Sequence, residues 1–242
     1  MNIRNLALSL SLLTLSACGF VSIDSPQPTP AEPAVETPNV GTSLRAERAA
    51  RQFVSVVETV EPVAEAECRA RTTGMNCDFN IVVDDRLNQP PNAFQTLDKS
   101  GRPVLAFNIP LIATVRNSDE LAFVMGHEAA HHIQAHIARQ QRNATAGAVI
   151  FGSIAAITGA GEAGVQSAQK AGASLGARTY SKDFELEADQ LGTIIAHKAG
   201  YDPVRGAAFF TRLADPGNTF LGTHPPNAAR IDIVRQTAAT LQ

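Results

Sequence analysis

The sequence has little net charge and no long run of basic residues. Its 242 residues include 20 lysines and arginines against 23 aspartates and glutamates, which gives a formal net charge of −3. Proteins that bind nucleic acid or an anionic membrane surface usually carry a basic patch or a basic run. We therefore expect neither nucleic acid nor an anionic membrane surface as a direct partner.

Internal repeats are also missing. The roughly 200 residues that follow Gly41 have the length of one domain and enough apolar side chains for a core.

No apolar run near the N-terminus is long enough to span a bilayer as a mature helix. Leu6–Leu15 is short and follows Arg4, as in a signal peptide. Leu15-Ser16-Ala17-Cys18 resembles the bacterial lipobox, so we expect residues 1–17 to be a signal peptide and Cys18 to carry lipid. Gly19 after the cysteine points to the outer membrane, facing the periplasm. The alternative is an ordinary signal peptide with an incidental cysteine.

Proline is concentrated just after this segment. Five prolines lie between Pro26 and Pro38, a composition that favours an extended spacer and cannot bury a core. The expected organisation is a lipidated tether over residues 18–41 and a single domain over residues 42–242.

Cysteine is scarce, with three residues in the chain. With Cys18 reserved for lipid, Cys68 and Cys77 remain as an even number in an oxidising compartment. We expect a disulfide between them, which would stabilise the fold by about 2–3 kcal/mol. The alternative is two buried thiols.

Apolar periodicity and helix-capping residues predict an α+β domain, mainly helical, with a small β-sheet beside the helix that carries the histidines. Strands are expected over residues 78–83 and 103–108, with a third strand left open. Helices are expected over residues 44–61, 118–142 with Ser118 as the cap, 182–198, from Pro203 and from about Pro226. Residues 143–161 carry no charge, and we favour a packed helix or lid there over a weak membrane or interfacial helix.

Four of the six histidines lie between His127 and His136, and His127-Glu128-Ala129-Ala130-His131 forms an HExxH motif. Helix positions four apart differ by about 6 Å along the axis and about 40° around it, so both imidazoles can bind one metal ion. Glu128 lies beside that face, within reach of a metal-bound water. The alternative is a pair of structural histidines.

A catalytic zinc ion usually has three protein ligands and one open position. Glu185 and Asp189 lie one turn apart on a predicted helix, while Glu187 projects elsewhere. Glu185 is the candidate third ligand, and Asp189 could accept a hydrogen bond from the outer nitrogen of His127 or His131. A solvated acidic face is the alternative, and the neighbouring apolar residues do not decide between them.

Further segments accompany these motifs in a fixed order: Pro91–Phe94, Asp119–Gly126 before the HExxH motif, Glu185-x-x-Ala188-Asp189-x-x-Gly192, Thr223-His224-Pro225 and Arg230-Ile231. Together they resemble the HtpX-like and CAAX prenyl protease family of zinc metallopeptidases, which includes periplasmic lipoproteins. The resemblance covers roughly residues 44–242. The chain departs from the family pattern at residues 95–102, so a cleavage preference is not implied.

The resemblance implies a gluzincin-type fold with Glu128 as general base and one zinc ion, whose ligands are His127, His131 and Glu185. It also brings His224 to the site, either as a stabiliser of the oxyanion or as a removable fourth ligand. From the sequence alone His224 would be an ordinary loop histidine. Arg230 is expected to orient the site or to pair with an acidic residue.

The expected function is that of an envelope endopeptidase acting on unfolded or misassembled proteins, with outer-membrane assembly proteins as further partners. Zinc would polarise the scissile carbonyl and acidify its bound water, and Glu128 would carry the proton to the leaving amine. Extended substrate could pair with the strand at residues 104–108. The alternative is an envelope chaperone or assembly scaffold that keeps zinc but cleaves little. The intact Glu128 favours the enzyme.

We predict that Cys18→Ala releases the folded domain from membranes, because the lipid anchor is chemically separate from the core. Membrane fractionation of cells that express the parent or the variant measures this. If the variant partitions with membranes as strongly as the parent, the tether is not the anchor, and residues 143–161 become the suspected one.

Overall fold

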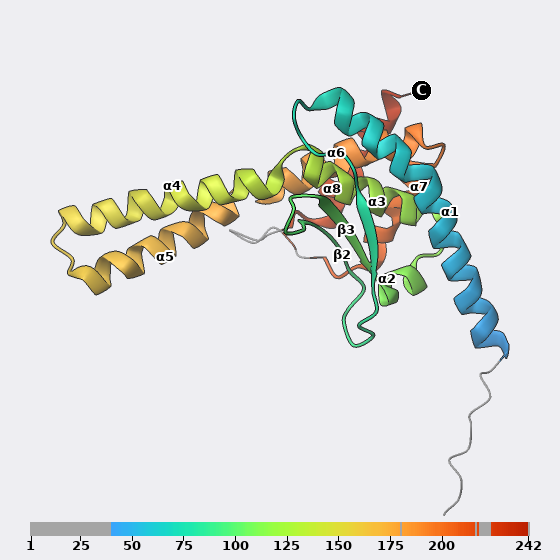
Figure 1. The fold of residues 1–242 in the computed structure, drawn as a ribbon, viewed down its shortest axis with the longest axis horizontal. Coiled ribbons are helices and arrows are strands. Elements are labelled where there is room, and N and C mark those ends of the chain that lie inside the picture. Colours follow the sequence, from blue (N-terminus) through green and yellow to red (C-terminus); the bar gives the residue numbers. More distant parts are fainter. Residues whose placement is uncertain (1–39, 180, 216, 218–223, 242) are drawn as a thin grey trace, which may run out of the picture. The chain divides into compact units, whose positions relative to one another are not determined.

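The computed structural model describes residues 40–179, 181–215, 217 and 224–241, so the predicted signal peptide, Cys18 and the proline-rich segment lie outside the described residues. The elements follow one another as α1 (Val40–Arg71), β1 (Asn80–Asp84), β2 (Ala93–Leu97), β3 (Pro103–Asn108), α2 (Ile109–Thr114), α3 (Ser118–Ile133), α4 (His136–Ile157), α5 (Glu162–Thr179), α6 (Ser181–Lys198), α7 (Pro203–Ala207), a 3₁₀ helix (Ala208–Arg212) and α8 (Asn227–Ala239) (Figure 1). This is the mainly helical α+β fold that the sequence predicts.

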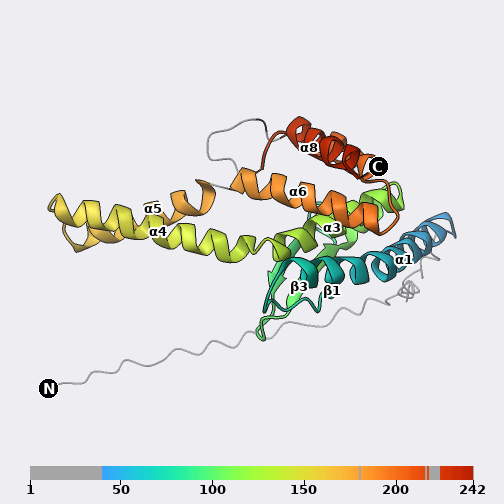
Figure 2. The same ribbon diagram turned by 90° about the horizontal axis from the view of Figure 1, so that it is seen from above.

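The three-stranded sheet has β3 at its centre. β1 pairs with β3 in parallel and β2 pairs with it in antiparallel fashion. Figure 2 shows α3, α6 and α8 in successive layers, with the sheet and α1 on the other side of α3. The core lies between the sheet, α1 and α3, where the rings of Phe53 and Phe107 meet edge to face at 5.6 Å. β2, which the sequence left unassigned, is an edge strand.

Helix α1 is longer than predicted. An end at Glu61, before Pro62, is wrong, because α1 continues to Arg71 with the proline inside it. An internal proline costs a helix about 3 kcal/mol through the lost hydrogen bond and a steric clash. Ala64 and Cys68 continue the buried face of the helix beyond the proline, and their burial offsets that cost.

A disulfide joins the end of α1 to the segment before β1. It links Cys68 and Cys77, whose Cα atoms lie 5.7 Å apart. Both cysteines are buried in the core, and the buried ring of Phe79 lies two residues after Cys77. This is the pair that the sequence led us to expect, and it closes the sheet against α1.

The histidine helix is shorter than predicted. Instead of running to Arg142, α3 ends at Ile133, and α4 begins at His136 after a break at Ala135, which has the left-handed φ of 54°. The N-cap of α3 is Asn117 rather than Ser118, since the Asn117 side chain accepts a hydrogen bond from the backbone N–H of Glu120. Two helices that change direction at a left-handed residue replace the one long helix.

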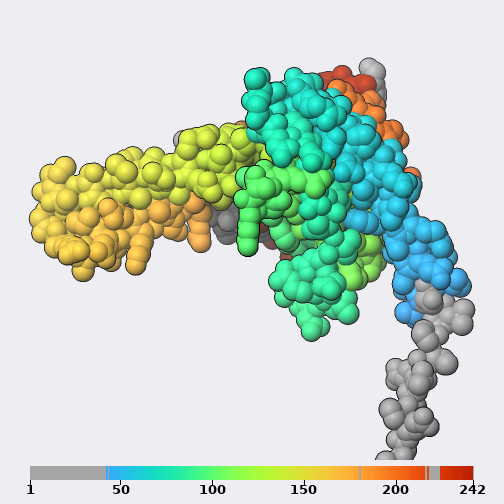
Figure 3. All heavy atoms as spheres, in the orientation of Figure 1, coloured from blue at the N-terminus to red at the C-terminus, as the bar shows by residue number. Residues whose placement is uncertain are grey.

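Helices α4 and α5 form an antiparallel hairpin that extends away from α3 and α6 (Figures 1 and 3). Their backbones approach so closely that a Cβ added to Gly147 would lie 2.0 Å from the carbonyl oxygen of Gly172. One face of the uncharged stretch of α4, which includes Gly147 and Gly152, packs against α5, while apolar side chains such as Ile154 and Ile157 remain exposed. In the described part of the chain, no helix is long and apolar enough to cross a membrane.

A second close approach joins α3 to α6. A Cβ on Gly126 would lie 2.8 Å from the carbonyl oxygen of Gly192, and a Cβ on Gly192 would lie 2.8 Å from the backbone nitrogen of His127. Only glycine at both positions allows the two helices to touch backbone to backbone. His127 on α3 and Glu185 on α6 therefore lie on two helices whose backbones are in direct contact.

We predict that Gly192→Ala pushes α6 away from α3, lowers the free energy of unfolding by about 1–3 kcal/mol, and weakens metal binding at the site between them. Chemical denaturation and metal content after dialysis measure the two effects. Gly161→Ala is the matched control, because an added Cβ there meets nothing within 4 Å. A Gly192→Ala protein with the stability and metal content of the parent would contradict the argument.

Candidate metal centre

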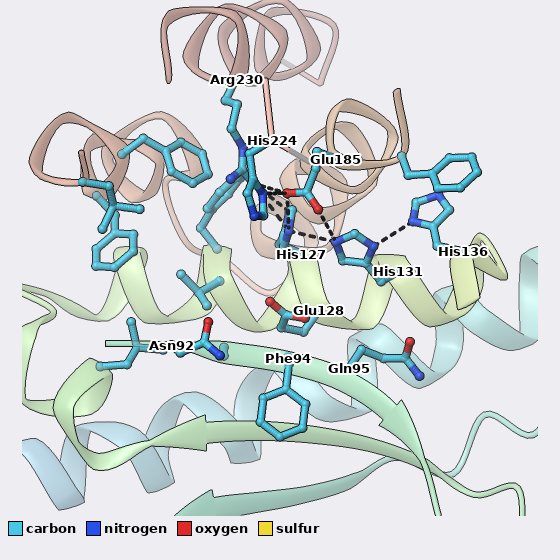
Figure 4. Close-up of a pocket in the computed structure, with 18 of the residues that line it drawn as sticks. Asn92, Phe94, Gln95, His127, Glu128, His131, His136, Glu185, His224 and Arg230 are labelled. Atoms are coloured by element: carbon cyan, nitrogen blue, oxygen red, sulfur yellow. Dashed lines mark hydrogen bonds and ion pairs between the residues drawn. The ribbon is translucent and has the colours of Figure 1, made fainter. Parts of the chain in front are cut away.

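Helix α3 directs His127 and His131 to the same side. Their Nε2 atoms lie 3.0 Å apart, and the two rings meet edge to face with centroids 4.6 Å apart (Figure 4). His127 is buried and His131 is partly buried. The four-residue spacing of the HExxH motif thus places both imidazoles on one face of the helix, as helix geometry predicts.

Glu185 meets the histidine pair from α6. Its Oε2 lies 3.7 Å from Nε2 of His127, and its Oε1 lies 3.4 Å from Nε2 of His131. Potential ligand atoms of the three residues all lie within 4.8 Å of one another. Two imidazole nitrogens and a carboxylate oxygen that converge in this way can hold a metal ion.

The charge around the cluster also fits a cation. Burial raises the pKa of Glu185, but hydrogen bonds with His131 and His224 and the charges of His127 and Arg230 outweigh it and hold that pKa well below its usual value. Glu185 is therefore a carboxylate, in the neighbourhood of two further acidic residues, Glu128 and Asp189, and a single guanidinium. A divalent ion would balance this excess of negative charge.

Asp189 and Arg230 support the first histidine. Oδ1 of Asp189 lies 2.9 Å from Nδ1 of His127, and the side chain of Asp189 is fully buried. Arg230 from α8 donates to both carboxylate oxygens of Asp189, at 2.7 Å each, and its guanidinium lies 3.9 Å from the ring centroid of Phe210. Of the two histidines that the sequence allowed as partners of Asp189, the structure thus selects His127, whose outer nitrogen meets the carboxylate. Arg230 neutralises the charge of this buried carboxylate.

His224 approaches from the segment before α8. Its Nδ1 lies 3.2 Å from Oε2 of Glu185, and its side chain is about half exposed. The hydrogen bond with Glu185 raises the pKa of His224, against the opposing effect of burial. Figure 4 shows His224 on the α6 and α8 side of the histidine pair, and Glu128 on the β2 side. Two side chains that can donate or accept a proton, His224 and Glu128, therefore lie on opposite sides of the cluster.

One contact of the cluster could not be foreseen from the sequence. Nδ1 of His136 lies 2.8 Å from Nδ1 of His131. On one continuous helix, a residue five positions on would point about 140° away. The break at Ala135 turns His136 back toward His131. The only signal in the sequence was the density of histidines in this segment.

A cavity of about 520 Å³ opens beside the cluster. Residues 91–95, on and before β2, form one of its walls, while His127, Glu128, Glu185 and His224 also line it. The rest of the lining is largely apolar, contributed by Leu111, Phe123, Val124, Phe184, Phe209, Phe210 and Leu213. A metal ion at the cluster would face a space large enough for the side chains of a polypeptide.

A family of known proteins resembles this chain over most of its length. Residues 50–238 match peptidase family M48. A Vibrio cholerae relative is 35% identical over 147 residues, which cover 55% of this chain and 30% of that protein. Relatives from Yersinia pestis and Escherichia coli O157:H7, both named beta-barrel assembly-enhancing protease, are 34% and 33% identical over 135 residues, covering 50% of this chain and 28% of theirs. The chain thus spans less than a third of the length of these relatives in each match.

We predict that Glu185→Gln weakens metal binding by about 100-fold or more, because it replaces a charged ligand, whereas loss of an outer partner costs about 10–100-fold. Glu128→Gln is the matched variant and should keep its metal. Metal content after dialysis and competition with a chromogenic chelator measure both. The opposite order, with metal lost only from Glu128→Gln, would show that the ligand assignment is wrong.

Proposed function

The chain belongs to peptidase family M48, a family of metallopeptidases, and we propose that it is a zinc-dependent endopeptidase of the bacterial cell envelope. The observation that carries this proposal is the convergence of His127, His131 and Glu185 beside Glu128, at the wall of a largely apolar cavity. Two histidines and one glutamate form a ligand set that catalytic zinc takes, with one position left for water.

The chemistry that zinc supplies at such a site is Lewis acidity toward the scissile carbonyl and the attacking water. Glu128 takes the proton of that water and passes it to the leaving amine. Asp189 keeps a proton on Nδ1 of His127, so that the Nε2 lone pair faces the cluster. Arg230 holds Asp189 in place through both carboxylate oxygens.

His224 is proposed to stabilise the oxyanion. It reaches the cluster from the side opposite Glu128, and an imidazole N–H at this place can donate a hydrogen bond to a developing oxyanion. The same contact with Glu185 would allow His224 to cover the open ligand position when no substrate is bound.

The proposed substrate is an extended segment of an unfolded or misassembled protein. Pairing with residues 104–108, which the sequence suggested, is wrong, because β3 is hydrogen-bonded to β1 and β2 on its two sides. The edge strand β2 is the alternative, since residues 91–95 line the cavity. Backbone pairing there would bind extended polypeptide with little regard to its side chains.

The proposed location is the periplasmic face of the outer membrane, with Cys18 lipidated, residues 1–17 removed as a signal peptide and residues 18–41 acting as a tether. The names of the Yersinia and Escherichia relatives connect them with β-barrel assembly. We extend this to the present chain as a proposal that assembling outer-membrane proteins are among its substrates or partners.

We expect the purified protein to digest casein, and we expect a chelator to abolish the digestion and added zinc to restore it. Glu128→Gln should fold and bind zinc like the parent but lose about 100-fold or more in kcat, because general-base catalysis contributes about 10²–10⁴-fold. A zinc-loaded parent that prevents aggregation of an unfolded client without cleaving it would instead support the scaffold function.

A further inference from the structure

A hydrogen-bonded chain of side chains leads from His131 through His136 to Glu187, on the side of the His131 ring that faces away from Glu185. We infer that His136 is a positioning residue that fixes the ring of His131 as a zinc ligand. This inference rests on the zinc site proposed above, and it concerns a residue that none of the sequence motifs includes.

The two nitrogens of His131 have different surroundings. Its Nε2 faces Glu185 at 3.4 Å and Nε2 of His127 at 3.0 Å, so this is the nitrogen that a metal ion would use. Its Nδ1 faces Nδ1 of His136 at 2.8 Å. A metal ion takes the lone pair of Nε2, so the proton of a neutral His131 lies on Nδ1 and must be donated to His136.

The next contact is consistent with this assignment. Because Nδ1 of His136 accepts, its Nε2 carries the hydrogen of the neutral ring, and that nitrogen lies 3.1 Å from Oε2 of Glu187. Each donor in the chain therefore meets an acceptor, ending on a carboxylate. Arg139 holds this carboxylate through both of its oxygens.

Aromatic packing keeps His136 in this orientation. The ring is buried and stacks on Phe184 from α6, with centroids 4.7 Å apart and an angle of 10° between the planes. The guanidinium of Arg139 lies 4.2 Å from the centroid of the same phenylalanine ring. His136 cannot swing away from His131 without losing this stack, and a flip of its ring would break the hydrogen bonds to His131 and Glu187.

His127 and His131 are then supported in equivalent ways. The outer nitrogen of His127 meets the carboxylate of Asp189 directly, and that of His131 meets a carboxylate through the ring of His136. Partners of this kind orient ligand histidines, and their loss typically weakens metal binding by about 10–100-fold.

The test compares zinc affinities of the whole chain by competition with a chromogenic chelator. His136→Phe keeps the stack on Phe184 but removes both hydrogen bonds, and it should bind zinc about 10–100-fold more weakly. His136→Asn should recover most of the loss, because an amide oxygen can take the place of Nδ1. The matched control is His132→Phe. His132 is also buried and also contacts a phenylalanine, but it hydrogen-bonds the Asn76 carbonyl and contacts no ligand.

A second measurement separates positioning from folding. The melting temperature of the metal-free protein should differ little between the parent and His136→Phe, while the rise in melting temperature on adding zinc should shrink in the variant. If His136→Phe does not fold, Glu187→Ala replaces it. That side chain is about one-third exposed, and the variant should bind zinc several-fold more weakly than the parent.

Parental zinc affinity in a folded His136→Phe, or in Glu187→Ala where that variant takes its place, would overturn the inference alone. An equal loss in His132→Phe would do the same, since it would reduce His136 to one of several buried histidines. A parent chain that binds no zinc would overturn the proposed zinc site as well, so the two failures are distinguishable.

Discussion

The direct backbone contact between α3 and α6 is the constraint on which the site depends. The HExxH motif can place two imidazoles on one face of α3, but the third ligand must come from a helix about 55 residues later. Gly126 and Gly192 let these helices touch without side chains between them. Glu185 then reaches both histidines, and Asp189, one turn further along α6, reaches the back of the first.

Burial of charge is the second requirement that this packing creates. Asp189 is fully buried and Glu185 nearly so, in a region where an unpaired carboxylate would cost several kcal/mol. Arg230 from α8 removes most of that cost for Asp189 and also lies 3.5 Å from Glu185. The remaining negative charge is what a cation at the cluster would neutralise. The layer formed by α8 therefore belongs electrostatically to the site, although it supplies no ligand.

The parts that could be predicted from sequence are those governed by local helix geometry. The spacing of His127 and His131 and the one-turn spacing of Glu185 and Asp189 follow from 3.6 residues per turn, whatever the rest of the fold does. His224 was placed near the site only by family resemblance, since it lies in a segment without periodicity.

The features that sequence could not give depend on tertiary context. Pro62 lies inside a helix because burial of the face beyond it outweighs the local penalty. The contact of His136 with His131 requires the left-handed backbone at Ala135, and no local signal marks an alanine as such a residue. The α4–α5 hairpin also has a consequence for how the molecule can evolve. Its two helices pack chiefly against each other. The hydrogen bonds of Glu187 with His136 and Arg139 lie where the hairpin begins. Whole turns, each about 5.4 Å, could be gained or lost at the far end as matched pairs without disturbing the ligands. The arm is thus a part whose reach natural selection can adjust while the chemistry at its root stays the same.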